Sequence, residues 1–311
     1  MELFGYNSQT IDNQLLSKIK IHSNVRIAKP YGDKYKEQFE ERLNKLLEQK
    51  YPQLITLKEE ANWINEQPFY VEHPELQVKV QPKFHYSRGG LVSKIGLRAT
   101  NRIVSLKEHD NGKDSGRMWR KDYLKSLFGD NYQSFDIKAS IYQLTLALNT
   151  NDWLDNKIDM YREIYGQDFE STEQRDKFKS LCMPLYFDKS DKKAIHHIRQ
   201  KAKLNEVMTD AESEFAIMSL RNRMKDTLGD NLFDSEVFLH ESVIYNHVLL
   251  ELIKLGWNVV QVYDGFYGTN KLNRNLSNDI SNILDSYINY YIRTYIHNNS
   301  IIYNSGTIRL Q

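Results

Sequence analysis

Asn258 to Tyr263 (NVVQVY) is the clearest strand in the chain, and it constrains the fold more than any other segment. It is short and rich in β-branched residues, which favour strands. The Asp264-Gly265 pair that follows is suited to a tight hairpin turn, and FYGT continues beyond it. Most other segments have the apolar spacing of helices, so the sequence predicts an α+β fold that includes this hairpin.

Helical patterns surround the predicted hairpin on both sides. We expect helices over 33–50, 57–66, 117–127, 137–148, 173–186, 192–228, 238–255 and 276–297. Pro184 should kink or end the fifth of these early. Residues 68–84 contain three prolines and alternating apolar residues, so we expect them to be extended, and residues 301–310 look like a strand pair.

Composition excludes several classes of protein. The 311 residues are 40% hydrophobic and 27% charged, as in a globular protein, and no run approaches the roughly 18 apolar residues of a membrane span. The N-terminus lacks the basic and apolar regions of a signal peptide. The single cysteine, Cys182, excludes an internal disulfide and a cysteine-rich zinc site, and we expect it to be a small buried residue. A cytoplasmic location and no membrane contact are therefore expected.

Charge is unevenly distributed although the net charge is only +1. Between Arg175 and Lys203 the chain has nine Lys or Arg against three Asp. Such a stretch can form a phosphate-facing surface or a solvated helix face, and composition leaves both open. The His196-His197 pair within it has no identifiable further ligands, so a phosphate contact or a surface pair is expected rather than a metal site.

Three short segments carry candidate chemistry when they are taken together. Asp136 stands where a predicted strand meets a helix, and Asp264 stands at the predicted hairpin. Two such carboxylates can hold a pair of Mg²⁺ ions about 3.5–4 Å apart for an in-line displacement. Arg175, Lys179 and Tyr186 fall near one helix face, which would offer two cations to a triphosphate and an aromatic ring to a base.

Each segment also has a simpler interpretation. An Asp before a helix is often its N-cap, and an Asp-Gly pair in a hairpin is often only a turn. Arg, Lys and Tyr on a helix often form a solvated face. The order and spacing of the three segments favour the catalytic interpretation over these alternatives.

That order resembles the superfamily of family A DNA polymerases and phage-type single-subunit RNA polymerases. Their motif A carries a metal-binding Asp where a strand enters a helix, and SFDIKASIYQL around Asp136 looks like it. Their motif B is Arg-x3-Lys-x6-7-Tyr-Gly, and RDKFKSLCMPLYF matches the Arg, Lys and Tyr. Their motif C is a hairpin with His-Asp before Glu or Ser, and VYDGFYGT occupies that place.

The resemblance extends over about residues 90–270. The family has a Thr-Gly-Arg segment and an Arg-rich helix that contact the template and primer backbone. IGLRATNRIV and RMWRKDYL look similar, which nominates Arg98, Arg102, Arg117 and Arg120 for those contacts. FLHESVIYNHVLLEL resembles the helix before motif C that bears a polar residue near the primer terminus, with His240 as the match.

The resemblance also implies ligands and departures. It implies Mg²⁺ or Mn²⁺ held by Asp136, Asp264 and the backbone carbonyl of Ile137. Ile141 replaces the Glu with which the DNA polymerases exclude the ribose hydroxyl, and Gln143 matches a Gln of the RNA polymerases, so ribonucleotide use is plausible. The residues that depart from motifs B and C are Phe187, Tyr263 and Gly265.

The implied architecture is a right-hand polymerase. Residues 1–84 would form a reduced helical thumb or partner-docking region, 85–149 and 231–311 the two parts of an antiparallel palm, and 150–230 the fingers. The chain looks similar in kind to the family A-like primase-polymerases of bacterial mobile elements, such as staphylococcal cassette chromosomes. The implied partners are template and primer DNA, nucleoside triphosphates, and a small single-stranded-DNA-binding accessory protein or a helicase.

Two other classes of protein stay open at this point. The altered motif C also fits a non-catalytic nucleic-acid-binding replication protein on a degenerate polymerase fold. An unrelated helical interaction protein would place the two aspartates far apart in space.

Overall fold

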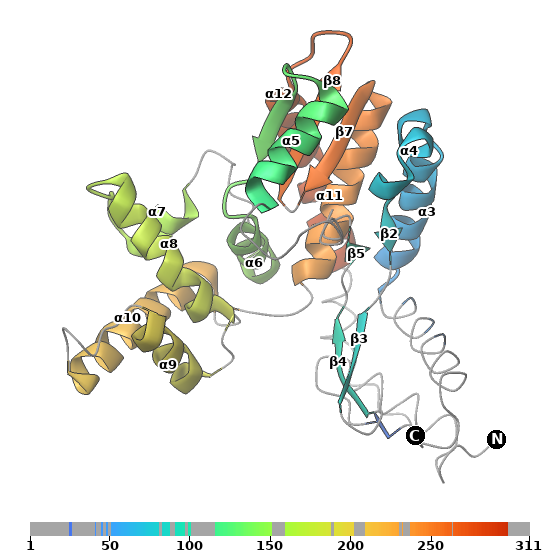
Figure 1. The fold of residues 1–311 in the computed structure, drawn as a ribbon. Coiled ribbons are helices and arrows are strands. Elements are labelled where there is room, and N and C mark those ends of the chain that lie inside the picture. Colours follow the sequence, from blue (N-terminus) through green and yellow to red (C-terminus); the bar gives the residue numbers. More distant parts are fainter. Residues whose placement is uncertain are drawn as a thin grey trace. The chain divides into compact units, whose positions relative to one another are not determined.

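A computed structural model describes residues 25–26, 41, 45, 48, 51–80, 83–87, 91–96, 99–100, 116–150, 159–187, 190–201, 209–229, 232, 237–262 and 264–297 (Figure 1). The structure is a mostly helical α+β fold with a small three-stranded antiparallel sheet, as the sequence predicts at this level. It divides into two compact units. Unit 1 comprises the described residues of 1–135 and 238–280, and unit 2 those of 136–237 and 281–311.

The three-stranded sheet is built from β6 (Gln133–Asp136), β7 (Trp257–Val262) and β8 (Gly265–Asn270), in the order β6-β8-β7. Strands β7 and β8 pair antiparallel from Trp257↔Asn270 to Val262↔Gly265. The predicted hairpin is confirmed, but its connection consists of residues 263 and 264 rather than Asp264-Gly265, because Gly265 is already the first residue of β8. At Gly268 an added Cβ would lie 2.4 Å from the carbonyl oxygen of Asn258, so only glycine fits in this close strand pair.

Helices of unit 1 cover both faces of this sheet. On one side lies α5 (Gly116–Phe128), which contacts β8 (Figure 1). On the other side lies α11 (Val237–Lys254), whose Tyr245 ring is 5.9 Å from the ring of Phe266. Five of the six residues of β7 are buried, as expected for a strand covered on both faces.

The N-terminal part of unit 1 packs beside β7. It contains α3 (Gln53–Asn65), α4 (Pro68–Glu72) and a 3₁₀ turn, η2 (Pro74–Leu76). The buried hydroxyl of Tyr70 donates to the carbonyl oxygen of Val259 at 2.8 Å, and Glu60 accepts from the Asn246 amide at 3.0 Å. These bonds attach α4 to β7 and α3 to α11.

Short strands complete unit 1. Strands β1 (Val25–Arg26), β4 (Leu91–Gly96) and β3 (Lys83–Ser87) form one sheet, and β2 (Lys79–Val80) pairs with β5 (Ala99–Thr100). The prediction that residues 68–84 are extended is therefore wrong for 68–76. Pro68 stands at the first helical position, where no N–H is needed, and the helix lets Tyr70 bury its ring.

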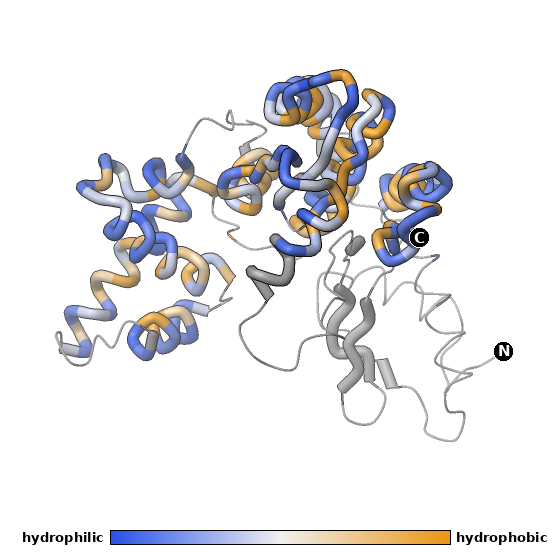
Figure 2. Tube along the Cα trace, turned by 45° about the horizontal axis from the view of Figure 1, so that its top comes forward, coloured by the Kyte–Doolittle hydropathy of each residue, from blue (hydrophilic) through white to orange (hydrophobic). Residues whose placement is uncertain are grey.

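Unit 2 is helical and has its own apolar core. It contains α6 (Ser140–Thr150), α7 (Met160–Tyr165), α8 (Thr172–Phe187), α9 (Asp191–Lys201) and α10 (Asp210–Leu228). Hydrophilic and hydrophobic stretches alternate along these helices (Figure 2). Buried side chains from all five helices form one cluster, which includes Cys182 as predicted, and burial raises the pKa of its thiol to about 12.

Several helix predictions are confirmed and two need correction. Helix α8 covers the predicted range and continues through Pro184 to Phe187, so Pro184 does not end it early. The predicted helix over 192–228 is two helices, because Thr209 begins α10 with a capping box in which its hydroxyl accepts from the Glu212 N–H. Helix α12 (Leu276–Tyr291) runs into a π-helical turn, η5 (Ile292–His297), over the predicted span.

Some predictions fall outside the described residues. These are the strand pair at 301–310 and most of the helix at 33–50. Among the described helices, none combines the length and apolarity needed to cross a membrane.

Candidate functional site

Asp136 is the last residue of β6, and its side chain is exposed. The next residue, Ile137, is 1% exposed, which anchors the chain immediately after the carboxylate. A turn follows in which Ala139 has a φ of +52°, and α6 begins at Ser140. The strand-to-helix transition predicted at Asp136 is therefore present.

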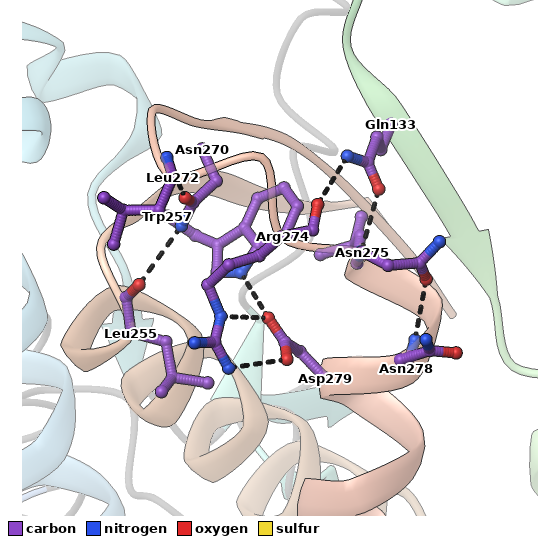
Figure 3. Close-up of polar contacts among 10 residues, drawn as sticks. Gln133, Leu255, Trp257, Asn270, Leu272, Arg274, Asn275, Asn278 and Asp279 are labelled. Atoms are coloured by element: carbon purple, nitrogen blue, oxygen red, sulfur yellow. Dashed lines mark hydrogen bonds and ion pairs between the residues drawn. The ribbon is translucent and has the colours of Figure 1, made fainter.

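Asp264 lies in the connection between β7 and β8, and it is also exposed. The direction of β6 decides where Asp136 lies relative to that connection. At the start of β6, the Gln133 amide donates to the carbonyl oxygen of Arg274 at 2.8 Å and accepts from the Leu276 N–H at 2.8 Å (Figure 3). Both partners follow the C-terminal end of β8, so β6 runs antiparallel to β8, and the end of β6 lies at the same sheet edge as the β7–β8 connection.

The opposite edge of the sheet is held by a buried carboxylate that sequence reasoning missed. Asp279, which is 7% exposed, receives a bidentate pair from Arg274 at 2.7 and 2.8 Å and the indole N–H of Trp257 at 2.9 Å (Figure 3). The hydrogen bond from Arg274 lowers the pKa of Asp279, and that from Trp257 adds to this. This network connects the start of β7 to the start of α12 and so stabilises this edge of the sheet.

The two cations of α8 share one helix face, as predicted. The guanidinium carbon of Arg175 lies 5.2 Å from the centre of the Tyr161 ring, and the Lys179 ammonium lies 5.7 Å from it. Arg175 also pairs with Asp159, with Nε–Oδ2 at 2.6 Å and Nη2–Oδ1 at 3.1 Å. Lys179 is exposed, and no described carboxylate pairs with it.

Asp159 is the second residue that sequence reasoning missed. It caps α7 by accepting from the Tyr161 N–H. Partial burial would raise the pKa of its carboxyl group, but the hydrogen bond and charge of Arg175, the Tyr161 N–H and the charge of Lys138 outweigh that effect and lower it. Arg175 therefore lies beside both the Asp159 carboxylate and the Tyr161 ring, Lys179 lies over the ring, and the charge of Lys138 acts on the carboxylate.

Tyr186 does not present its ring as expected. It is 1% exposed, its hydroxyl is hydrogen-bonded to that of Thr145, and its ring packs edge-on against Tyr142 at 5.1 Å. Phe178, Cys182 and Leu185 of α8 are buried in the same core, and Tyr186 is buried with them. The sequence predicted that these residues lie near one helix face, but it did not predict that Tyr186 points into the core of unit 2.

The two residues linked to sugar choice are also packed inside unit 2. Ile141 is half-buried against the core. Gln143 is 0% exposed, and its amide donates to the carbonyl oxygen of Lys138 at 3.0 Å. Instead of reaching toward a sugar, Gln143 braces the turn that follows Asp136.

The predicted primer and template contacts are only partly described. His240 lies on α11 and is 7% exposed. Arg117 and Arg120 belong to α5, but their side chains are outside the described part of the structure. Arg98, Arg102 and Tyr263 lie outside the described residues altogether.

The donor chemistry at the exposed sheet edge fits a hard divalent cation. No group of three or more His, Cys, Asp or Glu side chains suited to a metal occurs among the described residues. Mg²⁺ prefers oxygen ligands, keeps several waters and uses substrate phosphates, so two exposed carboxylates and the Ile137 carbonyl would suffice.

Comparison of the chain with protein-family models, with curated proteins and with solved structures gave no match. Function is therefore indicated by the chemistry of the sheet edge and of the α8 cations.

Proposed function

We propose that the chain is a template-directed nucleotidyltransferase, a DNA polymerase or primase, in which the three-stranded sheet serves as the palm and the helices of unit 2 as the fingers. The reaction is attack of a primer 3′-hydroxyl on the α-phosphorus of a nucleoside triphosphate, with release of pyrophosphate. The proposed role is primer synthesis or replication of a mobile element or phage.

The observation that most directly supports this proposal is the direction of β6. Because β6 is antiparallel to β8, the strand that ends in Asp136 and the connection that contains Asp264 share one edge of the sheet. Two exposed carboxylates at one edge can share divalent ions. Mg²⁺ or Mn²⁺ held there would neutralise phosphate charge and activate the attacking hydroxyl.

The cations of unit 2 supply the complementary charge. Lys138 is two residues from Asp136, and its charge acts on the Asp159 carboxylate. Because Lys138 and Asp136 are only two positions apart in the chain, a triphosphate bound by Lys138, Arg175 and Lys179 would lie near the Asp136 carboxylate. Asp159 holds the Arg175 fork in place, and the charges would stabilise the developing negative charge on the phosphates.

Primer extension by the full chain tests this proposal. The substrates are a primed DNA template, dNTPs or rNTPs, and Mg²⁺ or Mn²⁺. Asp136→Asn and Asp264→Asn should each reduce extension by at least about a hundredfold, which is about 2.7 kcal/mol of transition-state stabilisation. Asp226→Asn, which removes an exposed carboxylate of α10, is the matched control and should extend normally.

Thermal unfolding of the same variants separates chemistry from folding. Each Asn variant is compared with the parent, so a loss of extension counts as a loss of chemistry only where the melting temperature is unchanged. Normal extension by a well-folded Asp136→Asn variant would refute the assignment.

A non-catalytic nucleic-acid-binding protein on the same fold is the second candidate. It is favoured by the packing of Tyr186 in the core and by Gly265, which stands where the family has an acid or Ser. It predicts that the parent binds primed DNA in a gel-shift assay and makes no product with either metal.

A further inference from the structure

A groove of about 520 Å³ lies between α9 and α10 of unit 2, away from the residues assigned to the reaction. It is lined by Lys192, Ile195, His196, Arg199, Gln200 and Glu214. Five of these residues belong to α9, so the groove follows that helix. It coincides with the basic stretch that the sequence analysis left open between a phosphate-facing surface and a solvated face.

The two faces of α9 have different environments. Ala194 and Ile198 are 0% and 1% exposed and belong to the core of unit 2. Lys192, His196 and Arg199 are spaced by four and three residues, so they lie along one side of the helix. The core contacts fix the rotation of α9 and direct this row of residues into the groove.

Charge in the groove favours an anion. Arg199 pairs with Asp210 at the start of α10, which attaches α9 to α10 beside the groove. Lys192 and His196 are exposed and have no ion-pair partner among the described residues. The groove lining contains one carboxylate, that of Glu214, and three basic side chains, those of Lys192, His196 and Arg199.

An exposed aromatic residue directly follows a groove-lining residue in the sequence. Phe215 follows Glu214 on α10 and is 77% exposed, the most exposed large hydrophobic residue among those that the structure describes. A helix turns about 100° per residue, so Phe215 lies around the helix from the groove wall. Cationic grooves with nearby aromatic rings are how proteins bind single strands without reading sequence.

We propose that the α9–α10 groove binds the phosphodiester backbone of single-stranded nucleic acid, with Lys192 and His196 as phosphate contacts and Phe215 as a stacking platform for one base. The inference deepens the proposed function, since the strand would be the unpaired template. Basic side chains at successive turns of α9 suit a chain of phosphates better than a single phosphate group.

Fluorescence anisotropy with a labelled oligo(dT) of about 20 nucleotides tests the phosphate contacts. Lys192→Ala/His196→Ala in the full chain should weaken binding by about tenfold at moderate salt. It should also reduce the salt slope by about 0.7 for the Lys192 charge that is removed, because each neutralised single-strand phosphate contributes about that much. The neighbouring double variant Lys193→Ala/His197→Ala has the same composition on α9 but lies outside the groove lining, and it should change binding less than twofold.

The base contact is tested at Phe215. Phe215→Leu keeps an apolar side chain and removes the ring, and it should weaken oligonucleotide binding by at least about fivefold. Phe215→Tyr should restore parental affinity. Equal losses for Leu and Tyr, or no loss for either, would overturn the stacking role.

A triphosphate is the other source of the same anion chemistry. If inorganic triphosphate displaces the oligonucleotide at equal phosphate concentration, the groove is a small-anion site and the strand assignment is wrong. Parental affinity in the Lys192→Ala/His196→Ala variant, or an equal loss in the neighbouring variant, also overturns it.

The experiment separates this proposal from the polymerase proposal. Asp136→Asn should abolish extension and leave oligonucleotide binding intact. If the parent protein binds the oligonucleotide but extends no primer, only the polymerase proposal is refuted. If the parent protein extends primed DNA but substitutions in the groove do not change oligonucleotide binding, only the single-strand site is refuted.

Discussion

The sheet of unit 1 and the helical core of unit 2 hold their candidate residues in contrasting ways. At the sheet, the carboxylates stand exposed at strand ends, while a separate buried carboxylate, Asp279, holds the frame at the opposite edge. In unit 2, Arg175 is paired with Asp159, and Tyr186 is part of the core. The sheet therefore keeps its framework carboxylate apart from its candidate catalytic carboxylates, whereas in unit 2 the candidate residues are themselves part of the packing. Substitutions should separate stability from activity in unit 1 and couple them in unit 2.

Tyr186→Ala should have the largest effect on stability. It empties a fully buried aromatic site and should lower the free energy of unfolding by about 3–5 kcal/mol. Tyr186→Phe, which loses only the hydroxyl partner of Thr145, should cost about 1 kcal/mol. Urea unfolding of unit 2 measures both. A well-folded Tyr186→Ala variant that raises only the KM for nucleotides would instead favour the stacking role expected from the sequence.

Asp279→Ala should have the next largest effect. It leaves the buried Trp257 indole without its acceptor, at a cost of about 1–2 kcal/mol, while the partly exposed Arg274 fork can be solvated by water. Trp257 fluorescence should report the loss as earlier urea unfolding of the sheet. The matched change Asp285→Ala, at an exposed position of α12, should cost less than about 0.5 kcal/mol. Equal midpoints for the two variants would show that the network does not support the sheet.

The smallest effect is a pH dependence from Asp159. Its pKa is lowered in the folded state, so its contribution is complete above the ordinary carboxyl pKa and disappears as the pH falls through the folded value. Because both partners are partly exposed, that contribution should be less than about 1 kcal/mol. Asp159→Asn should therefore be less stable than the parent near pH 7 and equally stable near pH 2. A gap between their melting temperatures that widens in acid would contradict the ion-pair interpretation.

Local patterns in the sequence predicted much of the framework. The β7–β8 hairpin, the strand-to-helix transition at Asp136 and the helices α3, α5, α8 and α11 follow from residue preferences and apolar spacing within short windows. The direction of β6 could not be read this way. It depends on contacts between Gln133 and residues more than 140 positions later, and a single sequence carries no local signal for such a pair.

Orientation and pairing were the other gaps. Arg175 and Tyr186 lie near one face of an ideal helix, but packing of unit 2 decides that the first reaches Asp159 and the second enters the core. Asp159 itself precedes only a short helix, and no local pattern pairs it with a cation sixteen positions later. Residues 68–76 were misjudged because prolines mark helix starts as well as extended segments.

The two-residue connection between β7 and β8 has a consequence for how this chain can vary. Residues 263 and 264 alone join the strands, and the close approach of the Asn258 carbonyl oxygen at Gly268 leaves no room for a side chain there. A shift by one residue would turn every side chain of β8 to the opposite face. The location of Asp264 is thus dictated by the pairing of β7 with β8, and a change that disturbs this pairing would displace the carboxylate.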